Sequence, residues 1–260
     1  MAVLRAFAIV LVAAVLGAAA QVAPPPAAPA ATAAPPAQDK PLKLDIYYET
    51  NCPYCQGFIT KEVVPLWADP AWRALVQFHW VAFGMGSMAG STVTCQHGPD
   101  ECVGNRVQDC AKQHFGGDTD ATTDFILCME KNVANGMSSA FTTSFNECAP
   151  PGVAAQFMAC ARDDARSLPL VQANNQETQA AKITQVPWVS LPSVPGYNVF
   201  GPPLKDTLCA ELRDKSIPQP ASCSTPAPQA AVARLRRLRH LAAAGNTTEA
   251  AGNAAAAMLV

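Results

Sequence analysis

The sequence has few charged residues and no apolar run of membrane-spanning length. Lys, Arg, Asp and Glu make up 15% of the chain, and residues 40–223 hold 13 basic and 18 acidic side chains. This negative segment lacks the basic face that nucleic acid binding requires. A phosphate-binding glycine loop, a nucleophilic serine constellation and a His-x-x-x-His zinc motif are also absent. The sequence therefore predicts no nucleic acid partner and no metal site, and its distinctive feature is its ten cysteines.

The longest apolar run, AFAIVLVAAVLG at residues 6–17, is shorter than the ~20 residues that a helix needs to cross a bilayer. Arg5 precedes this run, and small residues follow it as far as Ala20, which is the arrangement of a cleavable secretory signal. We therefore expect residues 1–20 to be a signal peptide. We also expect no stable membrane insertion and a location in the secretory pathway, either secreted or in a lysosome or vacuole.

Two further segments have compositions that do not support a packed core. Residues 21–39 are almost entirely Ala and Pro, which predicts an extended linker. Residues 224–260 are rich in Ala and carry the basic stretch RLRRLRHL, so we expect a disordered basic tail or, alternatively, a removable sorting segment processed at Arg236-Arg237. The one N-glycosylation sequon of the sequence begins at Asn246, where we predict a glycan.

All ten cysteines fall between residues 52 and 223. In a secreted chain this density indicates disulfides, because the secretory route oxidises exposed thiols, whereas in a cytosolic chain it would suggest metal binding. The expected signal peptide favours disulfides.

The first part of the core has a clear strand and helix pattern. Apolar residues alternate with polar ones over residues 42–50, which predicts a strand with one buried face. After Pro53 the apolar residues recur at three- and four-residue steps, so we expect a helix that begins at Cys52 and that Pro65 bends or ends. Residues 75–84 are rich in aromatic and branched side chains and predict a second strand.

Residues 85–165 hold six cysteines, several short helical patterns and many helix breakers, and they predict a helical insertion held by disulfides. The remaining elements that we expect are a helix at 168–183, strands at 186–190 and 198–203, and a closing helix at 204–215. This order is that of an α/β chain with a thioredoxin-like fold and a disulfide-stapled helical insertion. The predicted domain spans residues 40–223.

Cys52 and Cys55 form a Cys-x-x-Cys motif at the predicted helix start. A thiol attacks a disulfide as the thiolate, and a second thiol must lie close enough to release the mixed disulfide. Free amides and the partial positive charge of a helix N-terminus favour an anionic sulfur on Cys52. We therefore predict that Cys52 is the nucleophile and Cys55 the resolving thiol, with a structural disulfide or a zinc site as alternatives.

Val186-Pro187 opens the late strand of the predicted fold. A proline at this place in a thioredoxin-like fold can take the cis form, which sets the backbone of its neighbour beside the dithiol. The alternative is an ordinary edge-strand proline.

The segment CQHGPDECVGNRVQDC resembles the signature of the gamma-interferon-inducible lysosomal thiol reductase family. The signature positions are Cys95, Gln96, His97, Gly98, Glu101, Cys102, Asn105 and Cys110. The segments YYETNCPYC, FILCME and VPWV are also similar to the family, so the resemblance covers about residues 42–223.

The resemblance implies that Cys52 and Cys55 are the redox pair, that Pro187 is the active-site proline, and that the fold is thioredoxin-like with a helical insertion. It also implies reduction of protein disulfides at acidic pH in endosomes and lysosomes. The roles of Gln96, His97 and Glu101 stay open. His97 lies between two cysteines, where a histidine can be a hydrogen-bonded loop residue or a catalytic base.

The eight cysteines outside the Cys-x-x-Cys motif allow many pairings. Short loops favour Cys148 with Cys160 and Cys209 with Cys223. The four others would then pair among themselves: Cys95, Cys102, Cys110 and Cys128.

The sequence thus predicts a thiol–disulfide oxidoreductase that reduces disulfide-bonded proteins, needs no cofactor, and is reset by an external small-molecule or protein thiol. The alternatives are an oxidoreductase of the DsbA or glutaredoxin type and a secreted binding protein with all its cysteines in structural disulfides. At pH ~5 a thiol of pKa ~8.5 is thiolate in only about one molecule in a few thousand. Activity in acid therefore requires a Cys52 pKa well below 7.

Overall fold

The computed structural model describes residues 39–133, 146–191, 194–197 and 201–223. The expected signal peptide, the tail with Asn246 and all of the linker except Asp39 lie outside the described residues.

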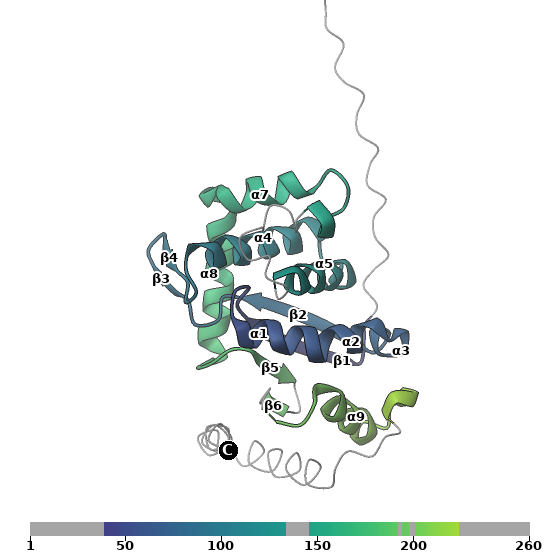
Figure 1. Ribbon diagram of the computed structural model, residues 1–260. Coiled ribbons are helices and arrows are strands. Elements are labelled where there is room, and N and C mark those ends of the chain that lie inside the picture. Colours follow the sequence, from purple (N-terminus) through teal and green to yellow (C-terminus); the bar gives the residue numbers. More distant parts are fainter. Residues whose placement is uncertain (1–38, 134–145, 192–193, 198–200, 224–260) are drawn as a thin grey trace, which may run out of the picture. The chain divides into compact units, whose positions relative to one another are not determined.

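A four-stranded sheet with the order β2-β1-β5-β6 lies at the centre of the fold (Figure 1). Its strands are β1 (Leu42–Tyr48), β2 (Val76–Ala82), β5 (Trp188–Leu191) and β6 (Val194–Tyr197). β1 runs parallel to β2 and antiparallel to β5, and β5 runs antiparallel to β6. A parallel β-α-β unit followed by an antiparallel hairpin is the thioredoxin-like arrangement, which confirms the predicted fold class.

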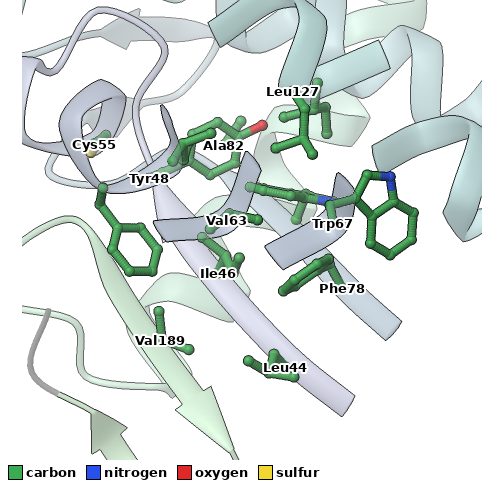
Figure 2. Packing of buried hydrophobic residues seen from close by; sticks show 14 of the residues in the cluster. Leu44, Ile46, Tyr48, Cys55, Val63, Trp67, Phe78, Ala82, Leu127 and Val189 are labelled. Atoms are coloured by element: carbon green, nitrogen blue, oxygen red, sulfur yellow. The ribbon is translucent and has the colours of Figure 1, made fainter. Parts of the chain in front are cut away.

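The alternation of residues in β1 and β2 gives the sheet two different faces. Leu44 and Ile46 are fully buried and pack with Phe78 of β2 on one face, as Figure 2 shows. On the opposite face, His79 Nε2 of β2 lies 2.8 Å from Glu177 Oε1 of α8 (Asp164–Ala180). The sheet is therefore enclosed between the helix that follows β1 and α8.

The helix that follows β1 has three continuous segments: α1 (Pro53–Phe58), the π-helical η1 (Ile59–Val63) and α2 (Val64–Ala68). A separate short helix, α3 (Pro70–Arg73), comes next. The helical path does not end at Pro65, which stands in the first turn of α2. Because Pro65 has no N–H to donate, the wider π-helical turn before it lets the helix continue without that bond. Val63 and Trp67 remain on the buried face (Figure 2).

Between β2 and β5, the described residues include a small hairpin and several helices. The hairpin is β3 (Ser87–Ala89) and β4 (Thr92–Thr94), and the longer helices are α4 (Pro99–Phe115), α5 (Thr119–Asn132), α7 (Ala154–Arg162) and α8. Phe115, Phe125 and Phe157 pack edge to face or tilted and join three of these helices. α8 starts at Asp164, four residues before the predicted 168, because the Asp163 side chain caps it by accepting from the Ala165 N–H. No helix among the described residues is long and apolar enough to span a membrane.

The disulfides of the insertion differ in part from the prediction. Cys95 bonds to Cys102 within the predicted group of four, but Cys148 does not bond to Cys160. The observed bonds are Cys110–Cys160 and Cys128–Cys148. α7 packs along α4 and brings Cys160 to Cys110, with a Cα–Cα distance of 6.0 Å. The preference for a short loop is a weak entropic effect, and helix packing overrides it here.

The C-terminal part contains α9 (Leu204–Asp214) and a short 3-10 helix, η3 (Ala221–Cys223). The predicted Cys209–Cys223 disulfide joins them and is confirmed. The strand predicted at 198–203 is wrong where the structure describes it, since residues 201–203 are not in a strand. The second strand of the hairpin is β6, which begins earlier because Leu191 of β5 already pairs with Val194.

Candidate active site

Cys52 and Cys55 lie where the end of β1 leads into α1. Cys52 has an extended backbone and is the N-cap of α1, and its carbonyl accepts a hydrogen bond from the Gln56 N–H at 3.0 Å. Pro53 follows at the start of the helix, where the missing N–H removes no helical hydrogen bond. Both cysteines are free thiols and are buried. The prediction that Cys52 stands at a helix N-terminus is confirmed.

The two thiols have opposite pKa shifts. A hydrogen bond from Cys55 is the largest effect on Cys52, and backbone N–H groups of Cys55 and Tyr54 and the charge of His97 act in the same direction. Together they outweigh burial and lower the pKa of Cys52 to about 6. Burial and the bond to Cys52 raise the pKa of Cys55 well above its ordinary value. Cys52 is therefore the sulfur that ionises first, while Cys55 keeps its proton.

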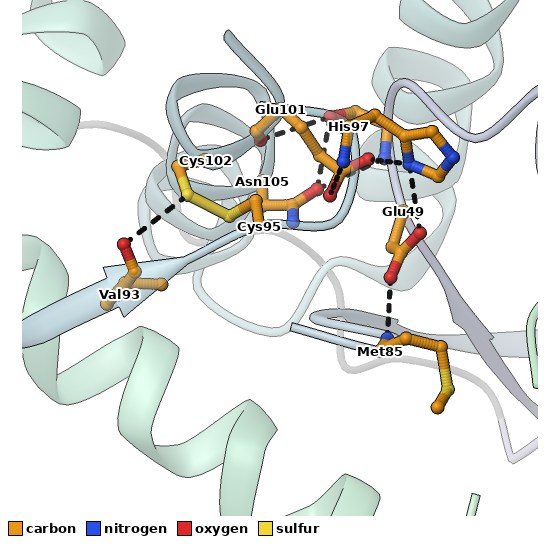
Figure 3. The surroundings of a disulfide bond; sticks show 9 residues. Glu49, Met85, Val93, Cys95, His97, Glu101, Cys102 and Asn105 are labelled. Carbon is orange, nitrogen blue, oxygen red and sulfur yellow. Dashed lines mark hydrogen bonds and ion pairs between the residues drawn. A yellow bond between two sulfur atoms is a disulfide. The ribbon is translucent and has the colours of Figure 1, made fainter. Parts of the chain in front are cut away.

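His97 belongs to a cluster with the carboxylates of Glu49 and Glu101, which Figure 3 shows, and this cluster lies beside Cys52. Its Nδ1 lies 2.5 Å from Glu101 Oε2 and 3.2 Å from Glu49 Oε2, and both carboxylate side chains are fully buried. Burial lowers the pKa of His97, but the hydrogen bond and charge of Glu101 and the charge of Glu49 outweigh it and raise this pKa. The Cys95–Cys102 disulfide closes the loop that carries His97. His97 is thus a hydrogen-bonded loop residue that also acts electrostatically on Cys52.

Glu49 comes directly after β1, and its side chain packs against the turn at Gly84 and Met85. Its Oε1 accepts a hydrogen bond from the Met85 N–H at 2.5 Å. Gly84 has φ +56°, and a Cβ atom there would lie 2.4 Å from Glu49 Cγ, so this turn requires glycine. Burial first, and then the charge of Glu101, raise the pKa of Glu49 to about 7.

Thr50 connects the dithiol loop to α4. Its N–H and its hydroxyl both donate to Asn105 Oδ1 at 3.1 Å, and the hydroxyl also lies 3.3 Å from the Glu101 carbonyl. On its other side, the Gln56 side chain donates to the Thr50 carbonyl at 2.9 Å. Asn105 of the signature therefore positions the segment that presents Cys52.

A groove of about 680 Å³ opens beside Cys52. The residues that line it are Cys52, Tyr54, Met85, Gln96, His97, Thr184, Gln185 and Val186. The Val186-Pro187 peptide bond is cis, which is one of the two alternatives that the sequence left open, and residues 184–186 line the same groove as Cys52. An extended substrate segment in this groove would contact Cys52 and the backbone before the proline.

A chain of buried polar groups lies behind the dithiol. The Tyr48 hydroxyl donates to Gln108 Oε1, and Gln108 Nε2 donates to Glu130 Oε1 at 2.7 Å. Burial raises the pKa of Glu130 to about 8, and the charge of Cys52 adds to this shift. Glu130 is therefore an electrostatic neighbour of the dithiol within the core.

The structure brings most of the signature together and separates one member from it. Gln96, His97, Glu101 and Asn105 surround the dithiol loop, and Gly98, with φ +93°, precedes α4. Cys110 lies further along α4 and bonds to α7.

Sequence reasoning missed Glu49 and Glu130. Glu49 is a charged residue directly after a strongly apolar strand, which is a signal that could have pointed to it. Nothing in the sequence pattern marks Glu130 as buried.

Glu49, Cys52 and His97 also form a group that could hold a metal ion. Each offers one potential ligand atom, and these atoms lie within 4.8 Å of one another. The sequence analysis, which judged metal binding from cysteine spacing and His-x-x-x-His motifs, predicts no metal site, and His97 is 45 residues from Cys52 in the sequence.

Comparisons with known proteins agree with this arrangement. Residues 43–151 match the model of the family described as gamma interferon inducible lysosomal thiol reductase (GILT). GILT-like protein 1 of Drosophila melanogaster is 38% identical over 100 residues, which span 34% of this chain and 40% of that protein. A gamma-interferon-inducible lysosomal thiol reductase-like protein of Anopheles gambiae is 30% identical over 194 residues, which span 68% of this chain and 78% of that protein.

Among solved structures, oxidised BdbD from Bacillus subtilis has a TM-score of 0.41 at 13% identity, covering 59% of this chain and 77% of that one. The strand order and directions, rather than this similarity, define the fold.

Proposed function

This chain belongs to the gamma interferon inducible lysosomal thiol reductase family, and we propose that it reduces disulfide bonds of proteins through Cys52 and Cys55. The observation that carries the proposal is the state of the two sulfurs. Cys52 is a free thiol at a helix N-terminus with its pKa lowered to about 6, and Cys55 is a free thiol that donates to it. A dithiol with one ionised and one protonated sulfur is the arrangement that thiol–disulfide exchange requires.

The reaction has two exchange steps. The Cys52 thiolate attacks one sulfur of the substrate disulfide, forms a mixed disulfide, and releases the other substrate sulfur as a thiolate that takes up a proton. Cys55 then loses its proton and attacks the Cys52 sulfur, which releases the second substrate thiol and leaves the Cys52–Cys55 disulfide. Two thiols of an external small molecule or protein reduce this disulfide and become oxidised themselves, so no cofactor takes part.

Substrates of this site are disulfide-bonded proteins that present an extended, partly unfolded segment. The groove beside Cys52 is open, and its Tyr54 and Met85 side chains are 66% and 41% exposed. Exposed apolar side chains of this size fit the apolar residues that unfolding uncovers. Thr184, Gln185 and Val186 line the same groove and offer it backbone groups beside Cys52, which supports the same binding mode.

The protein works in an acidic compartment of the secretory pathway. Among the described residues, four disulfides need an oxidising route for their formation. A Cys52 pKa of about 6 leaves about one thiolate in ten molecules at pH ~5, against about one in a few thousand for an ordinary thiol. The Anopheles gambiae relative is named as a lysosomal thiol reductase-like protein, which supports such a compartment.

The experiment is reduction of a denatured disulfide-bonded protein by the full chain across pH 4–8, with a low concentration of a small thiol as reductant. We expect reduction that persists at pH 5, that is lost in Cys52→Ser, and that Cys55→Ser converts into an accumulated mixed disulfide with the substrate. A wild-type chain with both thiols reduced and no activity at any pH would refute the proposal. Equilibration with glutathione separates the reductase from an oxidant of the DsbA type, because an oxidant keeps its dithiol reduced in buffers where a reductase becomes oxidised.

A further inference from the structure

Three side chains that could bind a metal converge at the nucleophile of this site. Cys52 Sγ, an imidazole nitrogen of His97 and a carboxylate oxygen of Glu49 lie within 4.8 Å of one another. Thiolate, imidazole and carboxylate are the ligand types that zinc takes in proteins, and a tetrahedral zinc site can be completed from such a group by small movements of side chains. Glu49 and Cys52 are three residues apart on the segment between β1 and α1, and the fold brings His97 to them from the loop before α4.

One atom of this group is buried without a hydrogen bond. The Glu49 side chain is fully buried, its Oε1 accepts from Met85, and its Oε2 has no hydrogen-bond partner. Oε2 does lie 3.2 Å from His97 Nδ1, but that nitrogen is closer to Glu101 Oε2, at 2.5 Å. The hydrogen bond of Nδ1 is therefore the one to Glu101, and Glu49 Oε2 faces His97 without a hydrogen-bond partner. A buried carboxylate oxygen in this condition is unfavourable, and it either takes up a proton, as the raised pKa of Glu49 reflects, or is met by a cation or another donor.

The surroundings of the group also match those of zinc sites. Glu101 bonds to the His97 ring and orients it, as carboxylates do for histidine ligands of zinc. Cys52 and Glu49 together contribute two negative charges when ionised, which a divalent cation neutralises. The groove of about 680 Å³ touches Cys52 and His97, so a fourth position is open to water or to a small ligand.

We propose that the reduced active site binds one Zn²⁺ through Cys52, His97 and Glu49. Zinc binding and disulfide attack exclude each other, because both use the same lone pair of the Cys52 sulfur. The oxidised protein does not bind zinc at this site, since Cys52 is then bonded to Cys55. Zinc is therefore a reversible blocking ligand of the reduced enzyme and not its cofactor.

The test measures zinc binding directly and needs no turnover. The full chain is reduced, desalted without oxygen and titrated with Zn²⁺ against a chromogenic chelator at pH 7. We expect one zinc per reduced chain, none at this site in the oxidised wild-type chain, and a loss of affinity of at least about tenfold in Glu49→Gln and in His97→Asn. Cobalt used as a probe should give a thiolate-to-metal charge-transfer band that Cys52→Ser lacks.

The controls separate this site from simpler explanations. Glu177→Gln removes a carboxylate from another histidine, His79, on the far side of the sheet, and should leave zinc affinity unchanged. Far-ultraviolet circular dichroism checks the fold of each variant, and the oxidised wild-type chain needs no substitution at all. Equal binding by the oxidised and reduced chains would overturn the proposal. So would full affinity in both Glu49→Gln and His97→Asn with loss in Cys55→Ser, because zinc would then be held by the dithiol alone.

This inference and the proposed function can fail separately. Disulfide reduction is measured in the presence of a strong chelator, where zinc binding has no influence. A chain that reduces disulfides but binds no zinc overturns the zinc site alone, and a chain that binds zinc but reduces no disulfide overturns the reductase alone.

Discussion

The Cys52 sulfur is stabilised as an anion by several groups that act together. A helix N-terminus alone contributes only ~0.3–1 kcal/mol, which is less than one pKa unit. The pKa of Cys52 is lowered to about 6, and from the ordinary thiol value of ~8.5 this change corresponds to ~3 kcal/mol. The hydrogen bond from Cys55 is the largest single cause of this change. The second cysteine therefore has two roles, since it resolves the mixed disulfide and also activates the first thiol.

This second role leads to a prediction for two substitutions at one position. Cys55→Ala removes the donor to Cys52 and should move the Cys52 pKa from about 6 back toward its ordinary value, by more than one unit. Cys55→Ser keeps a hydroxyl donor and should raise this pKa less. The measurement is the rate of Cys52 alkylation by iodoacetamide as a function of pH, which follows the thiolate fraction. Identical profiles for wild type and Cys55→Ala would show that the hydrogen bond does not set the pKa.

At the level of helices and strands, the disulfides of the insertion act on stability to different degrees. Cys110–Cys160 joins α4 to α7 across a sequence separation of 50 residues, whereas Cys95–Cys102 closes a separation of 7 residues. A crosslink stabilises the folded state chiefly by restricting the unfolded chain, and this effect grows with the length of the loop. The long-range bond should therefore be the more stabilising of the two.

We expect replacement of both Cys110 and Cys160 by Ala to lower the free energy of unfolding by about 4 kcal/mol, and replacement of both Cys95 and Cys102 by about 2 kcal/mol. Urea unfolding of the two double variants, followed by circular dichroism, gives the comparison. The reverse order of stabilities would mean that local packing at the Cys95–Cys102 loop, and not chain entropy, controls the result. The Cys95–Cys102 variant should also lose reductase activity, because that bond closes the loop that carries His97.

The elements around the dithiol were predictable because their signals are local. β1 has a strict alternation over its length, and the Cys-x-x-Cys motif follows at once, so the strand, the helix start and the redox pair can all be read from one short segment. The place of Val186-Pro187 in the expected fold made a cis bond one of two alternatives, and the structure has the cis form. These features need no knowledge of how distant segments pack.

Other features depend on packing between distant segments and could not be read from the sequence. The Cys110–Cys160 bond exists because α7 lies along α4, and no residue pattern specifies which helix faces which. β6 is found at Val194–Tyr197 because the pairing Leu191↔Val194 places the hairpin there. The cluster of Glu49 with His97 likewise joins segments that are 48 residues apart.

For the molecule as a whole, buried carboxyl groups should make the fold more stable in acid than at neutral pH. Burial raises the pKa of Glu49 to about 7, of Asp109 to about 6 and of Glu130 to about 8. The folded chain therefore holds these protons at pH values where the unfolded chain has released them. The stability that this contributes is complete below the ordinary pKa of each group and is lost as the pH rises through the raised pKa. Between pH 5 and pH 8, acid should stabilise the fold.

Cys52 acts in the opposite direction within part of this range. Its pKa is lowered to about 6, so its contribution is present above the ordinary pKa of the thiol and is lost as the pH falls toward 6. One thiol does not balance three carboxyl groups. We therefore expect the free energy of unfolding to be higher at pH 5 than at pH 8 by a few kcal/mol, since each pKa unit corresponds to ~1.4 kcal/mol.

Urea unfolding at pH 5 and pH 8 tests this in a chain with both Cys52→Ser and Cys55→Ser, so that free thiols cannot exchange with the structural disulfides. That background also removes the opposing effect of Cys52, which should enlarge the difference. Glu130→Gln is the matched control, because the Gln108 side chain can still donate to the amide oxygen while the titrating group is gone. The difference in the free energy of unfolding between pH 5 and pH 8 should be smaller in this variant, because the variant should lose less stability than the parent chain when the pH rises to 8. Greater stability at pH 8 than at pH 5 in the parent chain, or an unchanged difference in Glu130→Gln, would show that these buried carboxyl groups do not adapt the fold to acid.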